Sequence, residues 1–419
     1  MRKIDVLILG AGISGLASAL KSRIVGRESV IFEARDRAGG LLDNFVVQGF
    51  RFDNAVHLSF ASESDVRTIF DKTNFFTHSA DAKSYELNKW LKHPVQNNLY
   101  PLDAEEKVHL ISSFLERPDF IGENYKDWLN QQYGYALSER YPLRYTRKYW
   151  DTPAEQLSTT WIGDRMRRAK LDEILLGAFT ENTPNTYYLK EVRYPKYGGF
   201  RSFIEPLISE ACIEYNHEVS NLNVESKTVT FTNGVSIQYS TLISSIPLPA
   251  LVSITDNVPN NVIKASQSLT CTSIDLVSVG FNKKVVDDLW FYIYDEDILA
   301  SRAYSPSNKS PDNAPPGCSS LQFEIYTRGN KSKYTKEFLV ENVLYAIEKM
   351  QIASVDDILF THHKHLPYGN VIFDIEMEEN RRLARSIYKS PDVQLIGRFG
   401  EWDYLWSNQS FMSGYNVVL

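Results

Sequence analysis

The hydrophobic pattern at the start of the chain alternates apolar runs with a glycine-rich turn. Residues 4–9 are apolar and β-branched enough for a buried parallel strand, and the sequence GAGISG follows directly at 10–15. Apolar positions then recur at helical spacing over 16–20, and a second apolar run at 29–32 ends at Glu33. This order predicts a strand, a tight turn, a helix and a second strand, as in a nucleotide-binding βαβ unit.

Later apolar runs predict that the chain returns to this first sheet. Residues 214–237 alternate as short strands and contain a hairpin turn at Asn233-Gly234. Residues 241–247 have the pattern of a buried strand stopped by a proline, and residues 393–400 begin with another. We expect these strands to join the sheet of the first strand.

Two other regions have different patterns. Residues from about 103 to 190 carry amphipathic helical runs such as 105–111, which predict an inserted helical lobe. Residues 270–330 mix aromatic strand segments with a loop rich in Pro, Ser and Asn at 305–316, which predicts a sheet that faces the substrate. Residues 337–350 have the apolar spacing of one more helix.

Length and composition place the chain among globular proteins with more than one lobe. It has 419 residues, whereas one domain usually takes about 150. The formal net charge of −7 does not suit a surface that binds nucleic acid. No unbroken run of about eighteen apolar residues is present, so we expect no membrane span. An aromatic content of 13% provides flat surfaces on which a planar ligand can stack.

The three cysteines indicate a reducing compartment. Cys212, Cys271 and Cys318 share no CxxC spacing and cannot all pair, so we expect a cytoplasmic protein with no disulfide framework and no metal site. The sequence has no nucleophile-elbow motif and no suitable context for a catalytic cysteine, which argues against a hydrolase of either type.

Each glycine of the first turn has a physical role in binding a dinucleotide. Gly10 permits the tight turn, Gly12 lets a pyrophosphate approach the helix N-terminus, and Gly15 lets the helix pack closely on the strand. The carboxylate of Glu33, at the end of the second strand, can accept hydrogen bonds from ribose hydroxyls.

The residues after Glu33 discriminate between dinucleotides. Arg35 and the Gly39-Gly40 pair resemble the FAD-binding signature of the amine oxidase and glutathione reductase type flavoproteins. The predicted fold class is therefore α/β, with a Rossmann-like FAD-binding domain, an inserted helical lobe and a substrate-facing antiparallel sheet. The predicted domains are a discontinuous FAD-binding domain at 1–90, 205–250 and 390–419, a helical lobe at 100–190 and a substrate-binding sheet domain at 265–385.

Further segments, spread in order over nearly the whole chain, resemble the UDP-galactopyranose mutase family in its eukaryotic-type branch. His93 to Leu99 is similar to the nucleotide-base loop of that family, and it includes Gln96. The other similar segments are 148–153 with 160–165, 290–292 with 300–304, and 397–404 with 408–414.

The resemblance implies roles for individual residues. Arg165 and Arg302 match the arginines that contact the substrate diphosphate, and we expect them, with His57, to be catalytic. The planar guanidinium group suits this role because it donates paired hydrogen bonds that lysine cannot supply. The remaining residues implied at the site are Arg398 for the cofactor and Gln96, Trp161, Tyr368, Tyr404 and Asn408 for the substrate.

The activity implied by the resemblance is an isomerisation without net redox change. A nucleotide-linked hexopyranose becomes the hexofuranose through an adduct at N5 of reduced FAD, for the synthesis of cell-surface glycans. NAD(P)H is a possible reductant, although the sequence has no second GxGxxG motif to bind it. The oligomeric state stays open.

Two departures from the family pattern bear on the substrate. Ala55 and Val56 replace two glycines beside His57, so side chains stand where the family has bare backbone. His93 and Val95 replace aromatic residues that would stack on the uracil. We hypothesise that the substrate is a CDP- or dTDP-linked deoxysugar rather than UDP-galactose.

Two alternatives remain open at this stage. The first is a redox flavoprotein of the amine oxidase type, which would have no use for paired diphosphate arginines. The second is a flavin-holding structural or regulatory subunit, for which the Ala55-Val56 departure is the best argument.

Overall fold

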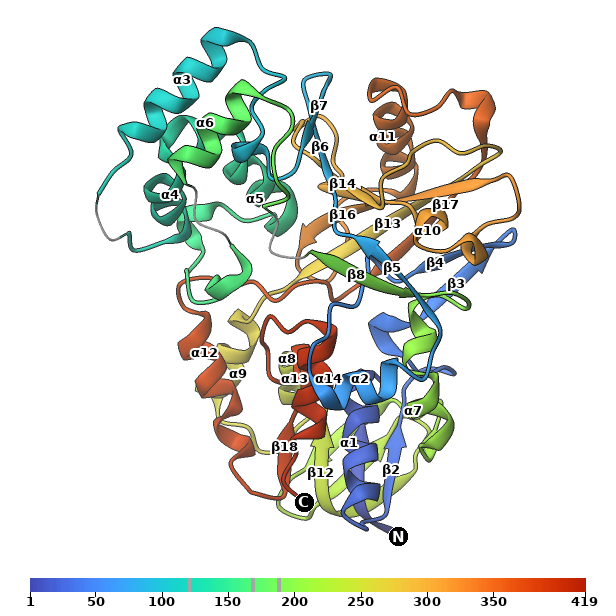
Figure 1. The fold of residues 1–419 in the computed structure, drawn as a ribbon. Helices are drawn as coiled ribbons and strands as arrows, with labels where there is room; N and C mark the ends of the chain where they lie inside the picture. The colour runs from blue at the N-terminus through green and yellow to red at the C-terminus, as the bar shows by residue number, and fades with distance from the viewer. Residues whose placement is uncertain (120–121, 167–169, 187–189) are drawn as a thin grey trace.

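The computed structural model describes residues 1–119, 122–166, 170–186 and 190–419. Its lower half, as drawn in Figure 1, contains both termini and a mainly parallel sheet, while a helical lobe and a second sheet form the upper half. The α/β fold class predicted from the sequence is confirmed. Among the described residues, no helix is long and apolar enough to cross a membrane.

The first sheet is built around the predicted βαβ unit. Its strand order is β10-β11-β12-β1-β2-β9, and β18 pairs in parallel with the second half of β12. The strands that were predicted to return to this sheet therefore do so. The strands are β1 (Arg2–Leu9), β2 (Ser29–Phe32), β9 (Ile213–Glu214), β10 (Val219–Asn223), β11 (Thr228–Phe231), β12 (Ser236–Ser244) and β18 (Val393–Leu395).

Two helices of this half pack closely on each other because a glycine lies at their contact. The C-terminal helix α14 (Ser407–Tyr415) lies against α1 (Ile13–Ile24). A Cβ on Gly414 would come within 1.9 Å of the carbonyl oxygen of Ser14. This contact brings the end of the chain next to the glycine turn at its start. The other helices of this half are α2 (Ser64–Phe70), α7 (Glu205–Glu210), α8 (Leu248–Ser253), α9 (Asn260–Ser268), α12 (Met377–Ala384) and α13 (Gly397–Gly400).

The second sheet alternates polar and apolar residues along its central strands. Leu321, Phe323 and Ile325 belong to the apolar core under helix α11 (Lys336–Lys349), so the intervening residues of that strand point to the opposite face. The strand order is β17-β13-β16-β15-β14-β6-β7. The strands are β17 (Ile358–Leu366), β13 (Thr272–Phe281), β16 (Ser319–Arg328), β15 (Arg302–Tyr304), β14 (Trp290–Ile293), β6 (Lys83–Glu86) and β7 (Lys89–Lys92).

The second sheet draws on more of the chain than residues 265–385. The β6–β7 hairpin lies at its edge, where β6 pairs with β14, although β6 falls in the range assigned to the FAD-binding domain from the sequence. The β6–β14 pairing is parallel, so the sheet is not wholly antiparallel. An alternating pattern predicts a strand but does not specify which sheet it joins.

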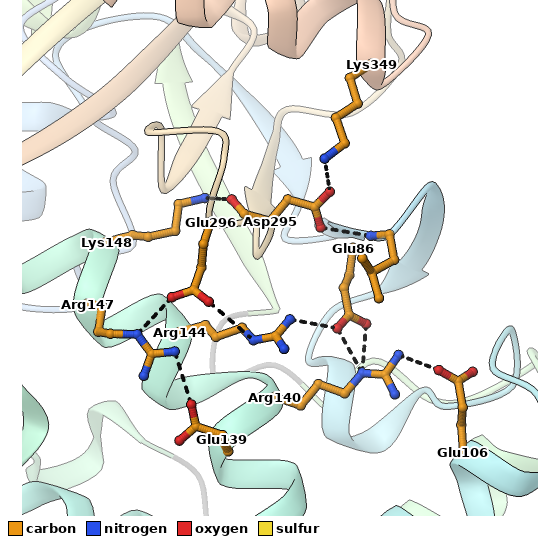
Figure 2. A network of polar contacts seen from close by, with 11 residues as sticks. Glu86, Glu106, Glu139, Arg140, Arg144, Arg147, Lys148, Asp295, Glu296 and Lys349 are labelled. Atoms are coloured by element: carbon orange, nitrogen blue, oxygen red, sulfur yellow. Dashed lines mark hydrogen bonds and ion pairs between the residues drawn. The ribbon is translucent and has the colours of Figure 1, made fainter.

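The helical lobe contacts the second sheet through charged residues. It contains α3 (Ala104–Leu115), α4 (Tyr125–Arg140), α5 (Pro142–Trp150) and α6 (Leu171–Phe179). Side chains of α4 and α5 form a network of ion pairs with Glu86 of β6 and with Glu296, which follows β14 (Figure 2). Two smaller sheets complete the fold and consist of β3 (Asn44–Val47) with β4 (Phe50–Asp53) and β5 (Phe75–Ser79) with β8 (Glu191–Pro195).

Candidate functional site

A cavity of about 1000 Å³ lies where the first sheet, the helical lobe and the second sheet meet. Its lining includes the glycine turn, the His57 segment, the loop at 93–96, helix α5, strand β14 and the C-terminal segment from 397 to 410. The volume is at the upper end of what small-molecule and cofactor sites usually have. Segments that are far apart in sequence thus surround one space.

The glycine turn forms one end of this cavity. Gly10 has a φ of +97°, and a Cβ on Gly15 would lie 2.0 Å from the carbonyl oxygen of Gly10, so neither position accommodates a side chain. Gly12 has open space at its Cβ position and lines the cavity at the N-terminus of α1. Backbone N–H groups at such a terminus favour an anion.

Glu33 lies at the edge of the same end. Its two carboxylate oxygens accept hydrogen bonds from the backbone N–H groups of Ala11, at 2.8 Å, and Arg35, at 3.0 Å. Arg35 and Gly40 also line the cavity. These bonds hold the carboxylate beside the glycine turn, where a ribose next to a pyrophosphate would lie.

The His57 segment enters the cavity in a conformation that favours glycine. Ala55 has a φ of +72°, in the left-handed region, which is unfavourable by roughly 1–2 kcal/mol for a residue with a Cβ. Of the two residues that replace family glycines, Ala55 alone carries this conformational penalty, because Val56 is not among the residues with positive φ. Both side chains line the cavity.

His57 is neutral in this environment. Burial lowers its pKa to about 4, and this effect exceeds the opposing influence of the nearby Asp53 carboxylate. Its Nδ1 lies 3.1 Å from the carbonyl oxygen of Ala55. Because a carbonyl only accepts, we assign the proton to Nδ1, which leaves Nε2 as a hydrogen-bond acceptor.

Three guanidinium groups lie close to a pair of tyrosines that line the cavity. The hydroxyls of Tyr149 and Tyr404 lie 2.9 Å apart. The guanidinium carbon of Arg302 is 5.5 Å from the ring of Tyr149, and those of Arg165 and Arg398 are 4.9 and 5.0 Å from the ring of Tyr404. Burial and the neighbouring Tyr149 raise the pKa of Tyr404, so its hydroxyl stays protonated. The arrangement concentrates positive charge and hydroxyl donors, which suits an anion with several oxygens.

Protein contacts orient these arginines. Arg165 donates to the carbonyl of Tyr404 and to Oε1 of Gln409, and its guanidinium carbon lies 4.4 Å from the ring centre of Trp406. Arg398 donates through Nε to the carbonyl of Leu405, at 2.8 Å. Contacts of this kind fix the orientation of both guanidinium groups.

Arg302 is held by a buried carboxylate. Its Nε donates to Oε2 of Glu324, and its Nη2 donates to the hydroxyl of Tyr326 at 3.0 Å. Burial alone would lower the pKa of Arg302, but Glu324 and the nearby tyrosines raise it well above its usual value. Arg302 is therefore a permanently charged group in the cavity wall.

Comparison with known proteins identifies the family of this chain. The sequence profile of the flavin containing amine oxidoreductases matches residues 13–371, which is well over half of the chain. The chain belongs to this family. Its match to the all-trans-retinol 13,14-reductase of Danio rerio has 37% identity over 71 residues, 16% of this chain and 12% of the reductase. The mitochondrial protoporphyrinogen oxidase of Nicotiana tabacum is 30% identical over 108 residues, 26% of this chain and 21% of the oxidase.

Solved structures extend the likeness to the whole fold. The crystal structure of a reduced UDP-galactopyranose mutase has a TM-score of 0.92 at 21% identity and covers 98% of this chain and 94% of its own. Wild-type putrescine oxidase bound to putrescine has a TM-score of 0.67 at 15% identity and covers 99% of this chain and 97% of its own. At these identities the likeness establishes the fold and leaves the reaction open, whereas the curated relatives match over about a fifth of their length or less.

The cavity fits the FAD that this family binds. The glycine turn, the open position at Gly12 and the anchored Glu33 form a site for the adenosine diphosphate part. Arg398, on the returning segment after β18, and His57 line the same cavity. The flavin signature predicted from the sequence thus agrees with the flavoprotein family that is identified for the chain.

The structure brings most of the predicted site residues into this cavity. Gln96, Trp161 and Tyr368 line it, as do the three arginines. Asn408 does not line it: its amide donates to Oε1 of Glu63 at 2.7 Å and so connects α14 to the start of α2. Gly15 lies behind the turn, where it permits close packing.

The loop predicted to contact a base has an aromatic neighbour from another strand. The His93 ring stacks on the ring of Tyr292, with centres 4.3 Å apart and an interplanar angle of 29°. Burial lowers the pKa of His93 to about 3, so the ring is neutral. Both residues line the cavity and supply a flat surface for stacking. Val95, at the other stacking position of the loop, is buried in the core.

Sequence reasoning missed several residues of the site. Glu324 and Tyr326 lie on the cavity-side face of β16, and Tyr292 lies on β14. Tyr149 lies in the segment 148–153, which resembles the mutase family, but the sequence did not single it out. One signal was available for Glu324: a strand that alternates Leu, Phe and Ile with Ser, Gln and Glu predicts a polar face.

Proposed function

We propose that this protein is a flavin-dependent mutase that converts a nucleotide-diphosphate hexopyranose into the hexofuranose without net redox change. The observation that carries the proposal is the cluster of Arg165, Arg302 and Arg398 around the Tyr149–Tyr404 pair, in one cavity with the dinucleotide turn. A second diphosphate, that of a substrate, needs such a cluster, whereas an amine substrate would be repelled by it.

The arginines hold a leaving group that must return. Arg165 and Arg302 would bind the diphosphate from two sides, and the protonated tyrosine hydroxyls would complete its contacts. If the diphosphate stays bound while the sugar ring opens and recloses, its recombination with the sugar is an intramolecular step. The protein's contribution is therefore orientation and charge stabilisation.

The flavin end of the cavity supplies the reactive chemistry. Reduced FAD, when bound, offers a nucleophilic N5 atom for the anomeric carbon. His57 presents a neutral ring whose Nε2 accepts a hydrogen bond, so it can hold a proton donor near this position without adding a charge. Val56 narrows the space beside it, which favours a sugar with fewer hydroxyls.

The identity of the base and the reductant are finer parts of the proposal. The His93–Tyr292 pair beside Gln96 offers a stacking surface that does not select uracil, so CDP- and dTDP-linked deoxysugars remain candidates with UDP-galactose. NAD(P)H is proposed as the physiological reductant.

A redox reaction of the amine oxidase type is the second candidate. Its support is that the curated relatives with sequence matches are a reductase and an oxidase, and that aromatic rings crowd the cavity. This reading leaves the three arginines without a role.

A product assay with reduced protein tests the proposal. Dithionite-reduced holoprotein would be incubated with UDP-, CDP- and dTDP-hexopyranoses, and the products separated by chromatography for an isomer of unchanged mass. The expected result is an isomer that forms with reduced flavin and is absent with oxidised flavin. Arg165→Lys, which keeps the charge but loses the paired donors, should reduce its formation by about tenfold or more. The proposal would be contradicted if none of the nucleotide sugars gave an isomer and the protein instead oxidised an added amine with release of hydrogen peroxide.

A further inference from the structure

Glu324 touches both halves of the candidate site. It is fully buried in the middle of β16. Its Oε1 accepts the backbone N–H of Val56 at 2.6 Å, and its Oε2 accepts from Nε of Arg302 and from the hydroxyl of Tyr326. One carboxylate thus connects the arginine that would hold a diphosphate with the segment that carries His57.

The connection reaches His57 through a single peptide group. The N–H of Val56 and the carbonyl of Ala55 belong to the same peptide plane. Glu324 binds its N–H, while the carbonyl accepts from Nδ1 of His57 at 3.1 Å. Because hydrogen bonds in a chain polarise one another, a stronger bond at the N–H makes the carbonyl a better acceptor for His57.

We propose that Glu324 is a positioning residue that transmits diphosphate binding at Arg302 to the flavin-facing His57 segment. The inference rests on the proposed function, since it takes a diphosphate as the ligand of Arg302. A diphosphate that binds the remaining N–H groups of Arg302 competes with Glu324 for the same positive charge. The carboxylate then forms a stronger hydrogen bond with the Val56 N–H, which changes the orientation of the 55–56 peptide plane and of the His57 ring.

The strained backbone makes this link a sensitive one. Ala55 keeps its left-handed φ of +72° against an intrinsic preference, so the hydrogen bonds from Glu324 at the N–H and from His57 at the carbonyl help to hold the orientation of the 55–56 peptide. A change in one of those bonds therefore alters the orientation of His57 more than it would in an unstrained loop.

Flavin absorbance reports whether the link exists. Inorganic pyrophosphate would be titrated into the oxidised FAD-bound protein, with binding followed by calorimetry and the flavin by its visible difference spectrum. We expect the wild type to give a spectral change that saturates, with its midpoint at the same pyrophosphate concentration as the midpoint of binding measured by calorimetry. In Glu324→Gln, whose neutral amide no longer shares the charge of Arg302, we expect binding within about tenfold of wild type but a spectral amplitude at saturation reduced about fivefold or more.

Tyr326→Phe is the matched control. It removes the hydroxyl that donates to the same carboxylate oxygen and accepts from Nη2 of Arg302, but it keeps the path from Nε of Arg302 through Glu324 to Val56. We expect an amplitude at saturation within about twofold of wild type. Should Glu324→Gln not bind pyrophosphate, Glu324→Asp is the second variant, because its shorter side chain cannot reach both partners and should lose the amplitude in the same way.

The outcomes separate the inference from the function on which it rests. A spectral amplitude at saturation equal to that of wild type in either Glu324 variant would overturn the inference. Pyrophosphate binding to the wild type without a spectral change would overturn it as well. Neither result would argue against the diphosphate site itself. Failure of pyrophosphate to bind the wild type at all would overturn the diphosphate site and the inference together.

Discussion

Two charged regions of this protein solve different problems with the same residue types. Behind the His57 segment, Asp53 and Lys309 form an ion pair of 2.7 Å in which both side chains are fully buried. At the boundary of the helical lobe, the network in Figure 2 begins at the buried Glu86 and ends at the largely exposed Glu139.

The regions differ in how many partners each charge has. Asp53 accepts hydrogen bonds from Lys309, Tyr194 and the backbone N–H of Phe200. Among the described residues, Asp53 is the one carboxylate with which Lys309 forms an ion pair. In the network, Arg140 pairs with both Glu86 and Glu106. Lost contacts in the network can be replaced by a neighbour or by water, whereas a lost contact behind the site leaves a bare buried charge. The enclosed pair therefore suits a part that must keep one geometry.

The largest effect is expected when the enclosed pair is broken on one side. Lys309→Met should reduce the free energy of unfolding by about 3–5 kcal/mol, because Asp53 keeps a buried charge without its counter-ion. Urea unfolding of the FAD-bound protein would measure this loss. The matched control is Lys284→Met, which breaks a pair of similar length, 2.6 Å, whose side chains are 63% and 89% exposed, and should change stability by about 0.5 kcal/mol or less.

Removing both charges of the enclosed pair tests the reason for that loss. Asp53→Asn combined with Lys309→Met should be markedly more stable than Lys309→Met alone, since no unpaired charge remains. If the double variant is no better than the single one, packing of the lysine stem accounts for the loss and the comparison with the network does not hold.

A smaller and graded effect is expected inside the network. Arg140→Gln should cost about 1–3 kcal/mol, because Glu86 is buried but keeps Arg144 at 3.5 Å as a second partner. Arg147→Gln, at a side chain that is 42% exposed, should cost about 0.5 kcal/mol or less and become neutral in high salt. Thermal unfolding at low and high salt measures both, and equal losses for the two variants would contradict the gradation.

The sequence predicted those parts of the site that are formed by adjacent residues better than those formed by residues from distant segments. The roles of Gly10 and Gly15 follow from one short motif, because the turn, the strand and the helix that need them are adjacent in the chain. Lys309 ends the short helix α10 (Pro306–Lys309) and acquires its role from Asp53 of β4, which is far away in sequence. No local pattern specifies that pairing. The same reason explains why the β6–β7 hairpin was not assigned to the second sheet.

Lys148 gives the network a pH dependence that can be isolated. Its Nζ donates to the carbonyls of Ile293 and Asp295, and burial lowers its pKa to about 7. Between that value and the ordinary pKa of about 10.4 the unfolded chain binds the proton and the folded protein does not, so stability increases with pH. The unfolding free energy of wild type relative to Lys148→Met should therefore rise by about 1–2 kcal/mol from pH 7.5 to pH 9. A difference that is constant with pH would show that Lys148 keeps its proton.

The smallest effect is expected at His57, next to the enclosed pair. Burial is the largest cause of its lowered pKa of about 4, while Asp53 raises it and Lys309 lowers it. Removing both charges together in the Asp53→Asn, Lys309→Met variant should thus leave its titration within about 0.5 pH unit of wild type, because the two influences oppose each other. Proton NMR of the histidine rings between pH 3 and pH 8, assigned with His57→Asn, would follow it. A shift of about one unit or more would mean that the charges behind the segment, rather than its burial, keep this histidine neutral.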